Sequence, residues 1–90
     1  MSIKINIPSY MKSFTSNIRV VEVNGSTVGE CLSHLVKQFP GTKKWLFSKH
    51  GNLFENIIIS VNGESAYPEQ LAKPVKDGDE LNIVLVIGGG

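Results

Sequence analysis

The amino-acid sequence predicts an α+β protein, in which one main helix packs on one face of a mixed sheet of about five strands. Three observations support this prediction: several short runs of β-branched residues, one stretch with helical spacing of apolar residues, and turn signals between them. The 90 residues suit one domain, expected over residues 1–87, and residues 88–90 are expected to form a flexible glycine tail.

The first two strands are expected close to the N-terminus, as a hairpin-like pair. Ile3, Ile5 and Ile7 alternate with other residues, which is the period-two pattern of a half-buried strand. Residues 18–23 are rich in β-branched side chains and end at an Asn-Gly turn signal. A polar connector joins the two segments.

The main helix is expected to begin at Thr27 and to end before Pro40-Gly41. The Thr27 hydroxyl can accept a hydrogen bond from a free backbone N–H, and Glu30 can reach back, as in a capping box. Six apolar side chains recur at spacings of three and four residues: Val28, Cys31, Leu32, Leu35, Val36 and Phe39. They form one apolar stripe along the helix, which must pack against a sheet to be buried.

The second half of the chain supplies the remaining strands. Residues 41–56 show no sustained period, so we expect a short helical turn and a loop there. Residues 57–61 are a nearly continuous apolar run, which predicts a central strand buried on both faces, and Asn62-Gly63 turns into a short strand over residues 64–67. Residues 81–87 form the last strand, expected in the middle of the sheet and parallel to the first.

Charge and cysteine content exclude several function classes. Nine Lys and Arg against eight Asp and Glu give a net charge of +1, which attracts neither nucleic acid nor an anionic membrane strongly. A single cysteine forms no internal disulfide, and we find no signal peptide and no apolar run of membrane-spanning length. We therefore expect a soluble, cytoplasmic protein with no nucleic-acid partner and no membrane partner.

Several side chains of reactive or aromatic type are assigned mainly to packing. Cys31 lies on the apolar stripe and is interpreted as a core residue, and His34 and His50 have no spacing typical of a metal pair, so no metal site is expected. Trp45 and Phe47 are expected to cap the core, with an interaction surface as the alternative.

The sequence does not decide which face of the last strand is buried. One alternate set of its residues must face the helix, and the other set, with Leu85 and Ile87 as candidates, can form an exposed patch with Phe14 or Tyr10 nearby. The alternative is that all these residues are central-strand core.

The end of the chain is unusual, because the last strand runs directly into Gly88, Gly89 and Gly90. Glycine loses much entropy on ordering and contributes no side chain to a core, so this run gives the fold no stability. A tail without side chains is thin, flexible and leaves its terminal carboxylate unhindered. These are properties of a reactive arm, although a frayed tail is the alternative.

The order of these segments resembles the ubiquitin-like sulfur carriers, which include the thiamine-pathway carrier, the small subunit of molybdopterin synthase and the cysteine-biosynthesis carrier. The matching segments are residues 27–30, 39–41, 59–64 and 76–81, followed by the terminal glycines. Residues 7–11 and 41–56 are most similar to the cysteine-pathway carrier. The resemblance implies a β-grasp fold, and it covers essentially the whole chain.

The resemblance also implies a mechanism. An adenylating enzyme uses ATP to convert the Gly90 carboxylate into an acyl-adenylate, and a sulfur donor protein or sulfide then displaces AMP to leave a thiocarboxylate. Gly88 and Gly89 insert into the partner, and a synthase finally accepts the sulfur. The chain itself is then a protein co-substrate, with no catalytic activity and no bound cofactor. Relatives usually end in two glycines, so Gly89 is the alternative reactive end, after removal of Gly90.

Other functions remain open beside that of a free carrier in the synthesis of cysteine or another sulfur metabolite. The chain can be the small subunit of molybdopterin synthase, or a ubiquitin-like modifier whose Gly90 forms an isopeptide bond to target lysines. A ubiquitin-like interaction module without tail chemistry is a further alternative. The resemblance also implies docking on the activating enzyme through the exposed sheet surface near the last strand.

Overall fold

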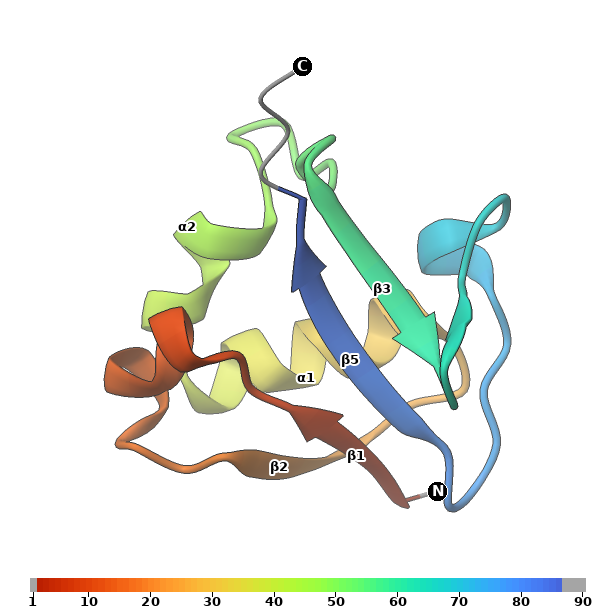
Figure 1. Cartoon of the computed structure of the whole chain (residues 1–90), viewed down its shortest axis with the longest axis horizontal. Coiled ribbons are helices and arrows are strands. Elements are labelled where there is room, and N and C mark those ends of the chain that lie inside the picture. The colour runs from red at the N-terminus through yellow and green to blue at the C-terminus, as the bar shows by residue number, and fades with distance from the viewer. Residues whose placement is uncertain (1, 87–90) are drawn as a thin grey trace.

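The computed structural model describes residues 2–86 of the chain. Its elements are the strands β1 (Ser2–Asn6), β2 (Val20–Asn24), β3 (Ile57–Val61), β4 (Glu64–Ser65) and β5 (Glu80–Leu85), the helices α1 (Val28–Gln38) and α2 (Lys43–Leu46), and the 3₁₀ helices η1 (Ser9–Thr15), η2 (Pro40–Thr42) and η3 (Gln70–Ala72). Figure 1 shows β5 running through the middle of the sheet toward the C-terminal end of the chain.

The five strands form one mixed sheet in the order β2-β1-β5-β3-β4. β5 pairs parallel to β1 and antiparallel to β3, with Leu81 opposite both Ile5 and Val61. β1 and β2 are antiparallel. The predicted sheet and the central, parallel position of the last strand are therefore confirmed. β1 pairs with the first half of β5, Glu80–Asn82, and β3 alone pairs with the second half, which leads toward the C-terminus.

Helix α1 covers one face of the sheet and begins where the sequence predicted. The Thr27 side chain accepts a hydrogen bond from the Glu30 N–H at 3.2 Å. Glu30 reaches back to Ser26 rather than to Thr27, accepting from the Ser26 N–H at 2.8 Å. The backbone and hydroxyl groups of Ser26 thereby lower the pKa of Glu30. The buried part of the helix comprises Val28, Cys31, Leu32 and Leu35.

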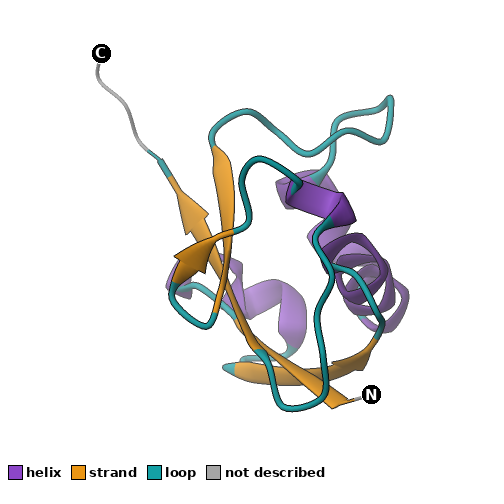
Figure 2. Ribbon diagram, turned by 90° about the vertical axis from the view of Figure 1, so that its right-hand side faces the viewer, coloured by secondary structure: helices purple, strands orange, loops and turns teal. Residues whose placement is uncertain are grey.

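Three details of the predicted strands are wrong. Ile58 is 41% exposed, so β3 is buried on one face only, because helices cover a single side of the sheet (Figure 2). β5 ends at Leu85 and β4 at Ser65, both earlier than expected. The connector between β1 and β2 is present as predicted and contains η1, whose Met11 side chain is fully buried as part of the core.

A hydrogen-bonded turn fixes the start of β5. The Asp79 carboxylate accepts from the Lys76 N–H and from Asn62 Nδ2, both at 2.9 Å, and the Asn62 side chain accepts from the Glu80 N–H at 2.9 Å. The Lys76 and Asn62 donors hold the pKa of Asp79 below its usual range. This turn therefore joins the β3–β4 hairpin to the central strand.

Replacing Asp79 by Asn is expected to lower the free energy of unfolding at pH 7 by about 1–2 kcal/mol, because an amide donor replaces one acceptor oxygen. The folded pKa of Asp79 is depressed, so its stabilisation is present above the unfolded pKa of about 3.9 and is lost as pH falls through the folded pKa. Urea unfolding at pH 7 and about pH 3, followed by Trp45 fluorescence, measures the difference between the two proteins.

The exposed Asp77 provides a matched control, since its carboxylate accepts one hydrogen bond, from the Ser2 N–H at 2.7 Å, which Asn can still accept. Asp77→Asn is expected to change stability much less. A stability difference for Asp79→Asn that stays constant between the two pH values would contradict the assigned role.

Candidate functional site

The site is built around the end of β5, which leads to the predicted reactive tail. Leu85 pairs with Ile57 of β3, and the Val86 N–H donates to the Asn56 carbonyl oxygen at 2.8 Å. Sheet hydrogen bonds therefore hold the backbone as far as Val86. The predicted site residues Gly88, Gly89 and Gly90 lie outside the described residues, as does Ile87.

An apolar patch lies on the open face of the sheet beside this strand end. Ile58 and Val84 stand directly opposite each other on β3 and β5, and Val86 follows two residues later. Their side chains are 41%, 44% and 43% exposed, respectively. We call these three residues the tail-end patch. Isolated exposed side chains of this size are ordinary, but these three lie together beside one strand end and are a candidate interaction surface.

Polar side chains follow the tail-end patch along the open face toward the beginning of β5, whereas Val20 on β2, opposite Asn6, is 47% exposed. Asn6, on β1, donates from Nδ2 to Glu80 at 2.8 Å and to Asn82 at 2.9 Å. These side chains lie on β1 and β5, toward the beginning of β5. The open face is therefore apolar where the chain leaves the sheet and polar where β5 begins.

Leu85, one of the two candidates for the exposed set, does not belong to it. Leu81 and Ile83 are buried beneath the helix, and Leu85 continues this set and packs, half-buried, against the core. The exposed residues of the alternating pattern are Val84 and Val86 instead. The strand prediction could not distinguish the two sets, because every residue from 83 to 87 is aliphatic.

An aromatic cluster lies at the same end of the molecule. The Trp45 ring contacts the rings of Tyr10 and Phe14, each at a centroid distance of 5.6 Å, and Lys44 Nζ lies 4.8 Å from the Phe14 centroid. Trp45 and Phe47 pack against the core, so their predicted capping role is confirmed. The cluster also explains why Tyr10 and Phe14 do not belong to the open face.

Polar atoms within this cluster are buried. Tyr10 Oη and Trp45 Nε1 have no hydrogen-bond partner among the described residues, and burial raises the pKa of Tyr10. Both residues line a cavity of about 340 Å³ together with Asn56 and Leu85, and Asn56 is the residue whose carbonyl oxygen accepts from the Val86 N–H. The tail-end patch and this cavity thus lie on opposite faces of β5, both beside its end at Leu85.

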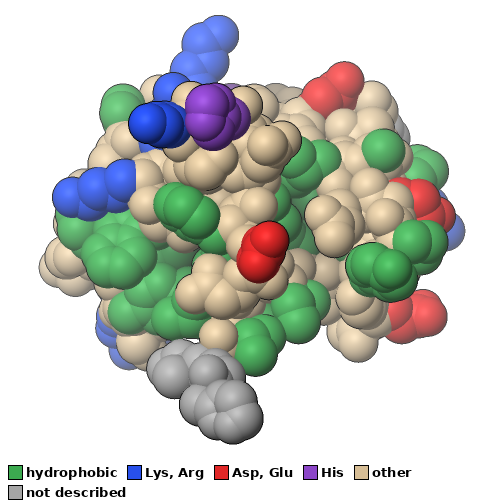
Figure 3. Space-filling model, turned by 90° about the horizontal axis from the view of Figure 1, so that it is seen from above, with side chains coloured by type: hydrophobic (Ala, Val, Ile, Leu, Met, Phe, Trp, Pro, Cys, Tyr) green, Lys and Arg blue, Asp and Glu red, His purple; other side chains and the backbone are tan. Residues whose placement is uncertain are grey.

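Charge is distributed unevenly around this end of the molecule. Figure 3 shows the end toward which β5 runs, with hydrophobic side chains over much of the surface, Lys and Arg mainly on one side and acidic side chains mainly on the other. The exposed lysines of this region include Lys43, Lys44 and Lys49, on α2 and the loop after it. The surface around the end of β5 therefore has an apolar centre and a basic flank.

Cys31 is a core residue, as predicted. Its side chain is fully buried on α1, and burial, followed by the charges of Glu30 and Asp79, raises its pKa to about 11. The thiol is therefore protonated at neutral pH and is no nucleophile. His34 has a structural contact, because its Nδ1 accepts from the Asn24 N–H at 2.7 Å.

The described part of the chain offers no metal centre. His50 lies exposed in the loop after α2, and residues 2–86 contain no group of three His, Cys, Asp or Glu side chains placed to share a metal ion. Within the same residues, no helix has the length and apolar character needed to span a membrane.

Comparison with known proteins identifies relatives along the whole length of the chain. Residues 6–90 match the model of the ThiS family. The sulfur carrier protein CysO of Mycobacterium tuberculosis is 29% identical over 93 aligned positions, which cover all of both chains. Small archaeal modifier protein 1 of Haloferax volcanii is 35% identical over 71 positions, 78% of each chain.

A solved structure has the same fold. In the BexX/CysO complex of Amycolatopsis orientalis, one chain superposes with a TM-score of 0.88 at 30% identity, covering 98% of this chain and 99% of that one. The match includes the segments that carry β3 and β5. The fold and the terminal glycine run therefore occur here in a chain whose relatives are sulfur carriers and protein modifiers.

Proposed function

This chain belongs to the ThiS family, and on that premise we propose that it is a sulfur carrier protein whose Gly90 carboxylate is adenylated and then converted into a thiocarboxylate. The thiocarboxylate donates sulfur in the synthesis of cysteine or another sulfur-containing metabolite. The observation that carries the proposal is the full-length similarity to CysO, in a chain whose central strand leads directly to terminal glycines.

The chemistry suits an unhindered C-terminal glycine. A carboxylate is a poor electrophile, so ATP first converts it into an acyl-adenylate, releasing pyrophosphate. Sulfide then attacks the carbonyl carbon; a C–S bond forms, the bond from this carbon to the phosphate oxygen breaks, AMP leaves, and the product is the thiocarboxylate. The activating enzyme supplies the ATP site and the metal. Gly90 has no Cβ beside this carbon, so the nucleophile approaches freely.

The described residues support docking of the activating enzyme beside the end of β5. Pairing of β5 with β3 and the bond from the Val86 N–H to the Asn56 carbonyl oxygen position the chain as far as Val86, and the tail-end patch offers an apolar surface beside this point. We infer that this patch meets an apolar groove of the activating enzyme while the glycines insert into its active site. The crystallised complex of A. orientalis CysO with BexX supports the idea that carriers of this fold dock on partners.

Exchange of labelled pyrophosphate into ATP tests adenylation directly. Incubation with candidate adenylating enzymes of the source organism is expected to give exchange that depends on the full chain. A semisynthetic chain with Gly90 as the carboxamide keeps every described contact but lacks the attacking oxygen, so no exchange is expected. Equal exchange with the carboxamide, or none with every candidate enzyme, would contradict the proposal.

Protein modification is a second candidate function, which the 35% identity to small archaeal modifier protein 1 favours. In that case the activated Gly90 acyl group forms an amide bond with a target lysine Nζ instead of accepting sulfur. Mass spectrometry of cell extracts would then find glycine remnants on the lysines of other proteins. If no such remnants are found and a thiocarboxylate is present, the chain acts as a sulfur carrier and not as a modifier.

A further inference from the structure

A groove lined by lysines lies beside helix α2. Its volume is about 410 Å³, and it is lined by Lys43 and Lys44 of α2 and by Lys49 of the loop after it. All three side chains are exposed, whereas Phe47, which also lines the groove, is half-buried against the core. Together with Pro40, Phe47 gives the groove an apolar part. The groove therefore offers three positive charges beside an apolar surface.

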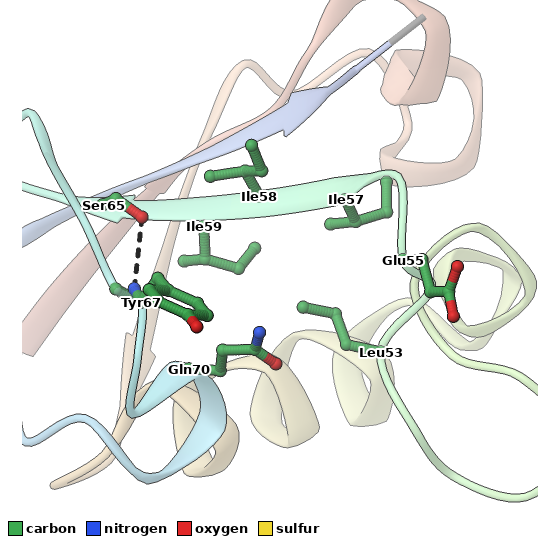
Figure 4. A pocket seen from close by; sticks show the side chains of 9 residues that line it. Leu53, Glu55, Ile57, Ile58, Ile59, Ser65, Tyr67 and Gln70 are labelled. Atoms are coloured by element: carbon green, nitrogen blue, oxygen red, sulfur yellow. Dashed lines mark hydrogen bonds between the residues drawn. The ribbon is translucent and has the colours of Figure 1, made fainter. Parts of the chain in front are cut away.

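The segments that form this region contain no acidic residue. Residues 31–54 have four lysines and no Asp or Glu. The 3₁₀ helix η1 lies against them, with the centroid of its Phe14 ring 4.8 Å from Lys44 Nζ, and residues 1–21 have no Asp or Glu either. Glu55, the next acid along the chain, lines a separate cavity beside β3 (Figure 4). Within the described part of the chain, no acidic side chain therefore lines the groove.

Two lysines elsewhere in the chain have acids as neighbours. Lys4 of β1 stands opposite Glu22 of β2 and Glu80 of β5 in the sheet. The Lys76 N–H donates to the Asp79 carboxylate at 2.9 Å. The charges that sum to +1 are therefore unevenly distributed, and Figure 3 shows basic side chains mainly on one side and acidic side chains mainly on the other. The groove lies in a part of the chain whose positive charge is not locally balanced.

We propose that this groove binds an acidic segment of a partner protein, with carboxylates on both sides of one apolar side chain. Carboxylates complement the three lysines, and the apolar side chain can contact Pro40 and Phe47. Lys44 also lines the cavity beside the end of β5, so the groove adjoins the surface where we expect the activating enzyme to dock. Binding of the segment uses none of the chemistry of Gly90, so it can be tested independently of the proposed function.

A protein segment fits this groove better than a nucleic acid does. Nucleic acids are held mainly by many phosphate contacts on strongly basic surfaces, whereas this chain has a net charge of only +1. A phosphate backbone also leaves the apolar part of the groove, formed by Pro40 and Phe47, without a matching partner. An acidic peptide with a central apolar residue matches both the charges and the apolar surface.

Amide NMR titration at low salt with the peptide acetyl-Glu-Glu-Leu-Glu-Glu-amide tests the proposal. Saturable shifts are expected at Gly41, Phe47 and Ser48, which line the groove, with Val84 on the open face unaffected. Affinity should fall about threefold or more between about 20 and about 300 mM salt, because salt screens exposed ion pairs. The same peptide with Gln for every Glu should not saturate. Equal binding of the Gln peptide, shifts centred on Val84, or no saturable shift at millimolar peptide would overturn the proposal.

Two double variants of equal net charge locate the binding surface. The variant Lys43→Gln/Lys49→Gln removes two charges from the groove and is expected to weaken peptide binding about fivefold. The matched control Lys4→Gln/Lys76→Gln removes two charges outside the groove and should leave the affinity unchanged. All four side chains are exposed, so both proteins should fold. Equal weakening would show that the peptide responds to net charge and not to the groove, which would overturn the proposal.

Two other occupants predict different results in the same titration. If the groove held the terminal carboxylate of the chain itself, the chain with Gly90 as the carboxamide would bind the peptide more tightly; we expect equal affinity. If the groove were a nucleic-acid site, a short oligothymidylate would shift the same amides and bind more tightly than the peptide at the same salt; we expect weaker binding. Either of these results would overturn the assignment to an acidic protein segment.

Discussion

Removal of Gly89 and Gly90 is expected to reduce charging of the chain about 100-fold or more, while the Tm changes by no more than about 1 °C. The two residues carry no side chain into the core, and the described fold is hydrogen-bonded through β5 as far as Val86. The shortened chain places its carboxylate two residues short of the attacking geometry. Pyrophosphate exchange measures charging, and thermal unfolding followed by the fluorescence of the single Trp45 measures stability.

Deletion of Gly90 alone is the informative companion variant. If Gly90 is the reactive end, as we propose, this variant is charged much less than the full chain; if a peptidase normally removes Gly90, it is charged at least as well. Substantial unfolding of the two-residue deletion would contradict the separation of the fold from the reactive tail.

The second large effect is expected from Val84→Asp in the tail-end patch. A carboxylate placed at the centre of an apolar interface must lose its hydration without a partner, so affinity for the activating enzyme is expected to fall about 100-fold. Val84 is 44% exposed and points away from the core, so stability should change little. Pyrophosphate exchange over a range of carrier concentrations gives the change as a raised KM.

Tyr67→Asp is the matched control, since Tyr67 is the most exposed large hydrophobic residue of the described chain and lies outside the patch. It should leave the KM for adenylation unchanged. If both variants raise the KM equally, or neither does, the tail-end patch is not the docking surface of the carrier.

Most of the fold was predictable because its signals are local. The capping residue Thr27, the apolar stripe of α1 and the Asn62-Gly63 turn each act within a few residues, and all appear in the structure. Asn62 adopts a positive φ of 53°, which its position in a tight turn requires. The central position of β5 followed from the order of elements rather than from any single residue.

The faces of the strands were not predictable for a physical reason. Every residue of the Ile57–Ile59 and Ile83–Val86 runs is aliphatic, so the alternation that separates buried from exposed positions is missing. Only the sheet register and the one-sided helix layer show that Ile58 and Val84 face outward. The buried donors of Tyr10 and Trp45 likewise depend on contacts between segments far apart in sequence.

The measurement that tests the central claim most directly is the intact mass of the chain purified from its native host. A carrier charged at Gly90 exchanges one carboxylate oxygen for sulfur, so a species about 16 Da heavier is expected, and it should disappear when Gly89 and Gly90 are deleted. A chain that shows only its unmodified mass, even after incubation with ATP, sulfide and each candidate adenylating enzyme, would contradict the assignment as a thiocarboxylate carrier.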